Sequence, residues 1–136
     1  LGHDRESNII DDFYNESLDR YQNINKQNIR ILYDIEEAKR NLSWNRRIVR
    51  LPVKEVISIT KLRLELNSED VFSNEIKYNK RILNTLDRWA HNLGITPPTI
   101  KKENGEYTYI DGRHRTLAAY YLNEDETIPV IIEYKQ

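Results

Sequence analysis

The chain has 136 residues, of which 38% are hydrophobic and 32% are charged, and its formal net charge is −1. This length allows one domain of ordinary size, or a small domain with an appendage. A net charge near zero excludes the general positive field of many nucleic-acid-binding proteins. DNA as a partner is therefore not supported by net charge and would require a local basic patch.

The sequence contains no cysteine. This excludes disulfides, thiol nucleophiles and zinc sites built on cysteine. Lack of disulfides fits a reducing compartment, and we expect a cytoplasmic location. No apolar run approaches the roughly 20 residues that a membrane-spanning helix needs, so we expect no membrane partner.

Residues 1–45 have the pattern of a helical extension. From Ser7 to Arg46 there is neither glycine nor proline, and apolar residues recur at alternating spacings of four and three. This stripe is typical of one long helix, or of two helices broken near residues 23–28. Asn28 would take an a position if the stripe formed a coiled coil. Two interpretations stay open: these helices bind a second copy or a protein partner, or they pack on their own domain.

Residues 46–136 form the second expected domain, for which the sequence predicts a small α+β fold. Residues 46–59 are β-branched and partly alternating, which favours a strand, and Pro52 places it at a sheet edge or bends it. Residues 66–94 predict a helix that Gly94 ends. The expected caps are Asn67 or Ser68, and the expected apolar face is Ile76, Leu83, Leu86, Ala90 and Leu93.

The last part of the chain predicts a β-hairpin, a short helix and a closing strand. The hairpin strands are Thr99–Lys102 and Tyr107–Ile110, joined by a turn at Asn104-Gly105. Residues 115–123 predict the helix. Residues 127–134 form a continuous apolar run that predicts a strand buried on both faces.

The junction between the hairpin and this helix, "DGRHR" from Asp111 to Arg115, places three basic side chains at a helix start. The helix dipole is already positive there, so stacked cations are unfavourable unless an anion is bound. A phosphate resolves this conflict: Arg115 can donate to two of its oxygens, and His114 to a third. Gly112 permits a tight turn and a close approach of a ligand to the backbone.

Asp111 has two open interpretations. Beside a bound phosphate, its carboxylate would hold Mg²⁺ together with phosphate oxygens, or accept a sugar hydroxyl or a reacting proton. Without a ligand, Asp111 would cap the helix, and Arg113 and Arg115 would be solvated or paired with it.

Residues 47–134 resemble the ParB/sulfiredoxin superfamily of nucleotide-binding domains. Gly112, Arg115 and Ala118 occupy the positions of the G-x-x-R-x-x-A motif, and the closing "IPV" strand follows in the expected order. Asp111, His114 and Arg115 further match the D-G-x-H-R form of the free-serine kinase branch. The resemblance implies a ParB/sulfiredoxin-like small mixed sheet with helices.

The resemblance also implies that Gly112, Arg113, His114 and Arg115 bind the phosphates of ATP or CTP. Lys61 and Arg63 lie where the superfamily brings a loop over the nucleotide. Asp111 is the implied catalytic and Mg²⁺-binding carboxylate, and Glu65 or Glu69 is the candidate for a second one. Arg113 departs from the pattern, because sulfiredoxin has its catalytic cysteine there and partition proteins have a glutamate.

We therefore expect a nucleoside-triphosphate-binding domain, which as an enzyme would be a phosphotransferase or an NTPase. One alternative is a non-catalytic regulatory or DNA-linked module that associates through the N-terminal helices. The other is a ParB-like nuclease. Whether the chain is an enzyme stays open from the sequence.

Overall fold

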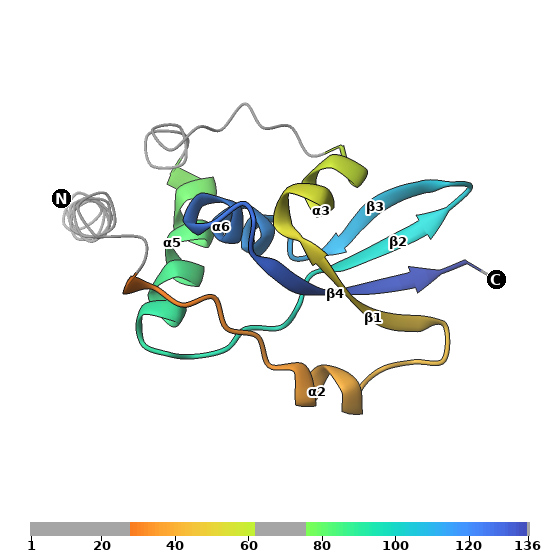
Figure 1. The fold of residues 1–136 in the computed structure, drawn as a ribbon, viewed down its shortest axis with the longest axis horizontal. Helices are drawn as coiled ribbons and strands as arrows, with labels where there is room; N and C mark the ends of the chain where they lie inside the picture. The colour runs from red at the N-terminus through yellow and green to blue at the C-terminus, as the bar shows by residue number, and fades with distance from the viewer. Residues whose placement is uncertain (1–27, 62–75, 136) are drawn as a thin grey trace, which may run out of the picture.

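The computed structural model describes residues 28–61 and 76–135, which form a mixed α+β fold (Figure 1). This confirms the predicted α+β class. The expected caps Asn67 and Ser68, and residues 1–27 of the expected helical extension, lie outside the described residues. In chain order the elements are α2 (Ile35–Arg40), β1 (Arg46–Pro52), α3 (Val53–Ile59), α5 (Ile76–Ala90), β2 (Thr99–Glu103), β3 (Glu106–Asp111), α6 (Arg113–Leu122) and β4 (Thr127–Tyr134).

The four strands form one mixed sheet in the order β1-β4-β2-β3. β4 pairs antiparallel with β1 and parallel with β2, and β2 pairs antiparallel with β3. β4 is therefore a central strand, and its predicted burial on both faces is confirmed. Ile128 and Val130 are fully buried on the helical face, and Ile131 is 6% exposed on the other face.

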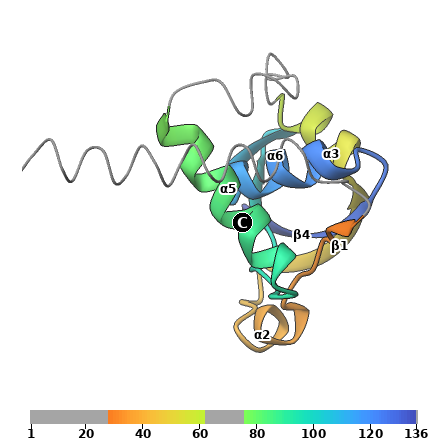
Figure 2. The ribbon, with the colours of Figure 1, turned by 90° about the vertical axis from the view of Figure 1, so that its left-hand side faces the viewer.

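Helices α3, α5 and α6 enclose the hydrophobic core on one face of the sheet (Figures 1 and 2). α6 packs against both α3 and α5. Its Ala118 and Ala119 are fully buried, since small side chains let the helix approach its neighbours closely. No helix in the described ranges is long and apolar enough to cross a membrane.

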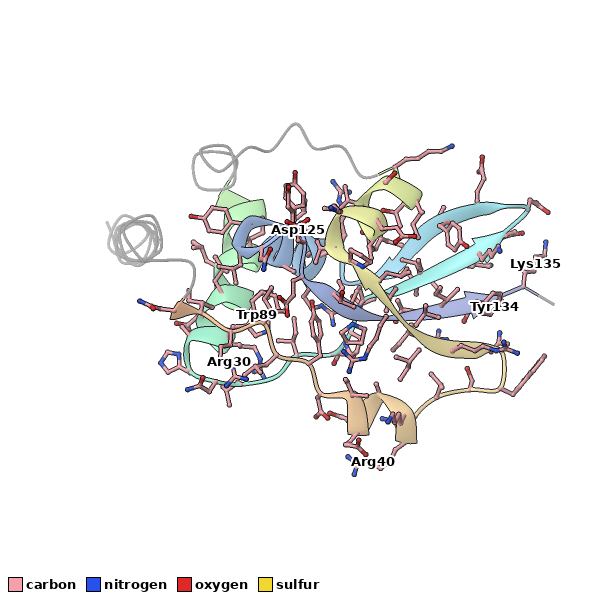
Figure 3. The ribbon with its side chains drawn as sticks, in the orientation of Figure 1. Arg30, Arg40, Trp89, Asp125, Tyr134 and Lys135 are labelled. Carbon is pink, nitrogen blue, oxygen red and sulfur yellow. The ribbon has the colours of Figure 1, made fainter. Side chains whose placement is uncertain are left out.

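The short helix α2 lies across the opposite face of the sheet (Figure 2). The side chain of Asp34 caps it by accepting a hydrogen bond from the Glu37 backbone amide at 3.0 Å. Ala38 is its buried residue, and Arg40 lies at its outer end, pointing away from the sheet (Figure 3). α2 therefore covers part of the second face without belonging to the main core.

The first strand is shorter than predicted, because residues 53–59 form helix α3. Its buried side chains Val53, Val56 and Ile57 follow a spacing of three and four, which is the helical period. Pro52 lies at the N-cap, where its fixed φ suits the start of a helix. The expected place of Pro52 on an edge strand is confirmed, because β1 is at the sheet edge.

The predicted helical stripe does not extend through residues 28–34, which are not α-helical. Tyr33 forms a parallel bridge with Ile95, and the indole nitrogen of Trp89 donates to the Leu32 carbonyl at 2.8 Å. The side chain of Trp89, a residue of α5, contacts this segment (Figure 3). Ile29 is buried in the main core. These tertiary contacts outweigh local helix propensity here.

Helix α5 ends at Ala90, earlier than predicted, because Asn92 takes the left-handed conformation with φ 59°. The Leu93 amide then donates to the Arg88 carbonyl at 2.9 Å, which closes the helix end. Gly94 has another role: a Cβ there would lie 3.2 Å from the backbone of Tyr33 and of Asp34. Because α5 ends before Leu93, this side chain is 48% exposed and is not on the packed face of the helix.

The predicted hairpin is confirmed. Asn104 and Gly105 have φ values of 53° and 78°, and they join β2 to β3. Two consecutive left-handed residues are typical of the tight turn that Asn-Gly favours. The hairpin brings the end of β3 beside the start of β2, which sets the position of the junction at residues 111–115.

The sequence pattern placed Leu86 and Leu93 on one helix face. Because α5 ends between them, truncation of each to alanine should lower the free energy of unfolding by different amounts. Leu86→Ala should lower the free energy of unfolding by about 2–5 kcal/mol, because it leaves a cavity in the core. The matched variant Leu93→Ala should cost about 0.5 kcal/mol or less. Urea denaturation followed by circular dichroism measures both values. Equal losses would contradict the helix end described here.

Candidate functional site

The junction between β3 and α6 is a one-residue turn. β3 ends at Asp111, Gly112 is the N-cap with φ 91° and ψ 17°, and α6 begins at Arg113. No side chain caps the helix by a hydrogen bond. The start of α6 therefore presents backbone N–H groups without a side-chain cap, together with the positive end of its dipole.

Gly112 is required here by its backbone conformation and by its neighbour. A Cβ at this position would lie 2.6 Å from the Cα of Pro98, which is too close for any other residue. The expected tight turn is confirmed. The close approach to Gly112 comes from Pro98, which is itself buried and whose carbonyl accepts the Ile131 amide at 2.9 Å.

Arg115 joins three parts of the junction. Its guanidinium donates to Asp111 Oδ2 at 2.5 Å and to the Thr96 carbonyl at 2.6 Å. Its side chain is only 20% exposed. Of the ligand-free interpretation of Asp111, the pairing with Arg115 is present and the helix cap is not. Arg115 therefore holds the end of β3 against the segment before β2.

A pocket of about 350 Å³ lies at the start of α6. α5 forms one wall, and the junction forms the other. The lining contains four arginines and one carboxylate, so its charge is strongly positive. The lining residues are Arg81, Asn84, Thr85, Arg88, Ile95, Asp111, Gly112, Arg113, His114 and Arg115.

The four arginines of this pocket differ in their partners. Arg115 is held as described, and Arg88 donates to the Gly94 carbonyl at 3.1 Å. Arg81 and Arg113 are exposed, and neither guanidinium has a hydrogen bond or ion pair to another residue in the described ranges. Two positive charges in the pocket are therefore available to an anionic ligand.

The sequence prediction missed Arg81 and Arg88. They lie seven residues apart on α5, so they share one face with Asn84 and Thr85. The helical spacing of these polar residues is visible in the sequence. Nothing in the sequence said that they face the start of α6, because that requires the packing of the two helices.

Lys61, another predicted site residue, does not line this pocket. Lys61 lies at the end of α3, and its Nζ is 3.8 Å from a carboxylate oxygen of Glu106 on β3. Arg63, Glu65 and Glu69 lie outside the described residues. The structure thus brings together Asp111, Gly112, Arg113, His114 and Arg115, all from the junction.

Two phenols near the junction are protonated at neutral pH. Burial raises the pKa of Tyr109, although hydrogen bonds with Thr60 and Thr116 and the nearby Arg113 oppose this. Burial also raises the pKa of Tyr33, against the opposing charge of Arg115. Neither phenol can serve as a base near neutrality, and among the described residues Asp111 is the carboxylate that lines the pocket.

Comparison of the chain with protein-family models, with curated proteins and with solved structures finds no match. The resemblance to the ParB/sulfiredoxin superfamily therefore stays a prediction. The function must be argued from the pocket and its residues.

The geometry at Gly112 predicts a specific effect of adding one methyl group. Gly112→Ala combines a left-handed φ with a clash against Pro98, and should cost about 2–4 kcal/mol of folding free energy. Gly105→Ala is the matched control: it also has a positive φ, but nothing lies within 4 Å, so its cost should be about 1 kcal/mol. Thermal denaturation compares the two. A smaller loss for Gly112→Ala than for Gly105→Ala would contradict the close packing on Pro98.

Proposed function

We propose that this chain binds a nucleoside triphosphate, with the phosphates in the pocket at the start of α6. The observation that carries the proposal is the concentration of four arginines around a helix N-terminus that no side chain caps. Such a helix end and arginine side chains are complementary to phosphate oxygens. The D-G-x-H-R pattern of Asp111 to Arg115 supports a nucleotide of the ParB/sulfiredoxin type, such as ATP or CTP.

The residues of the pocket divide into two roles in this proposal. Arg81 and Arg113 donate to the phosphate oxygens, because they have no other partner in the described ranges. Arg115 positions the junction and adds its charge, since two of its five N–H groups already donate to Asp111 and Thr96 and hold the guanidinium in place. This differs from the expectation that Arg115 itself donates to two phosphate oxygens.

The pocket also fits Mg²⁺ bound together with a nucleotide. Mg²⁺ is usually held by one or two carboxylates, phosphate oxygens and water. Asp111 supplies one carboxylate, of which Oδ2 accepts from Arg115 while Oδ1 has no hydrogen bond within the described part of the chain. No group of three or more His, Cys, Asp or Glu side chains among the described residues could hold a metal alone. In this proposal the phosphates complete the metal's ligands.

Phosphoryl transfer or NTP hydrolysis is the reaction class that such a pocket supports. The arginines and Mg²⁺ would neutralise the charge that develops on the transferred group. Asp111 would accept the proton of the attacking hydroxyl or water. The non-catalytic alternative keeps the same binding site and differs only in turnover.

Calorimetric titration with ATP, CTP and GTP in the presence of Mg²⁺ tests the binding proposal. At least one should bind, and Arg113→Gln or Arg81→Gln should each weaken it by about 10- to 100-fold, because each removes a charge-assisted hydrogen bond. Arg40→Gln is the matched control, since Arg40 lies at the outer end of α2 and does not line the pocket (Figure 3). If all three nucleotides fail to bind to folded protein, the proposal is wrong.

Formation of the nucleoside diphosphate from the bound nucleotide, with water or an alcohol as the acceptor, separates the catalytic from the non-catalytic form of the proposal. If the chain is an enzyme, Asp111→Asn should lower its turnover by about 100-fold or more, since it removes the general base. Arg40→Gln should leave turnover unchanged. Binding without any turnover, with a range of alcohols as acceptors, would favour the regulatory module.

A further inference from the structure

A second cavity, of about 390 Å³, lies on the other side of the junction, between α2 and the second face of the sheet. Asp111 lines this cavity as well as the basic pocket. Thr96, whose carbonyl accepts from Arg115, also lines it. The Asp111–Arg115–Thr96 group is therefore a thin partition between two cavities of similar size.

The cavity has apolar walls on both sides. α2 and the residue after its C-cap contribute Ala38 and Leu42, and the sheet contributes Ile110 and Ile131. Ile110 is 47% exposed although it faces this cavity. A large apolar side chain left half uncovered inside a cavity indicates a surface that an apolar ligand face would cover.

The rim of the cavity is polar and rich in hydrogen-bond acceptors. Glu37 of α2 has no side-chain hydrogen bond or ion pair within the described ranges, so its carboxylate is available. Asn41, one helical turn further, adds an amide. The one cation of the lining, Arg46, is already paired with Glu133 at 2.9 Å.

We propose that this second cavity holds the nucleoside part of the nucleotide whose phosphates occupy the basic pocket. This inference rests on the proposed function. A nucleobase has flat apolar faces and a polar edge, which matches two apolar walls with a polar rim. Asp111 borders both cavities and its side chain is 66% exposed, so a ligand that passes over this carboxylate can extend from the arginines to α2.

The free carboxylate of Glu37 sets the class of base. An ionised carboxylate only accepts hydrogen bonds, so it favours a base edge that carries an amino group. Adenine, cytosine and guanine have such a group. Uracil offers a single ring N–H flanked by two carbonyl oxygens, so a carboxylate that accepts from it lies beside both oxygens, which is repulsive. The cavity therefore selects amino-bearing bases and discriminates against uracil.

Titrations with ATP, CTP, GTP, UTP and inorganic tripolyphosphate, all with Mg²⁺, test this inference. At least one amino-bearing nucleotide should bind about tenfold or more tightly than both UTP and tripolyphosphate. Ile110→Ser should weaken that nucleotide about tenfold and leave tripolyphosphate unchanged. Glu37→Gln should reduce the preference over UTP, and its neighbour Glu36→Gln, which does not line the cavity, should not.

The outcomes distinguish the phosphate site from the nucleoside cavity. If tripolyphosphate binds as tightly as every nucleotide, the nucleoside cavity is wrong while the phosphate site stands. If neither tripolyphosphate nor any nucleotide binds, the proposed function itself fails, and this inference with it. Equal weakening of tripolyphosphate by Ile110→Ser would show a general structural effect and would overturn the role of Ile110.

Discussion

The double hydrogen bond of Arg115 is the interaction on which the geometry of the site depends. One guanidinium holds the end of β3 through Asp111 and the segment before β2 through Thr96. The distances are 2.5 Å to Asp111 Oδ2 and 2.6 Å to the Thr96 carbonyl, and the Arg115 side chain is 20% exposed. This group fixes the orientation of the first turn of α6, and with it the basic pocket on one side and the cavity under α2 on the other.

The packing around Gly112 supports the same arrangement from below. Pro98 fills the space that a side chain would need, and its carbonyl accepts the amide of Ile131 from β4. The turn therefore packs on a residue that is itself hydrogen-bonded to the central strand of the sheet. Functional groups held on a rigid scaffold keep their geometry when a ligand binds.

Local patterns predicted much of this fold. Asn104-Gly105 specified the hairpin, and the apolar run of β4 specified a strand buried on both faces. What local patterns could not give depends on contacts between distant segments. Residues 53–59 have β-branched side chains but meet the core with a helical period, and residues 28–34 pair with Trp89 and Ile95. In the same way, the junction was predicted as a site, whereas Arg81 and Arg88 joined it only through the packing of α5 against α6.

The sheet order also has a consequence for the synthesis of the chain. β1 and β2 are not neighbours, and β4, the last strand, pairs with both of them. Arg46 at the start of β1 pairs with Glu133 near the end of β4. A nascent chain therefore leaves β1 and β2 with unpaired edges until β4 has emerged from the ribosome. Such edges are open to intermolecular pairing, so chaperone contact would matter most just before synthesis of β4 is complete.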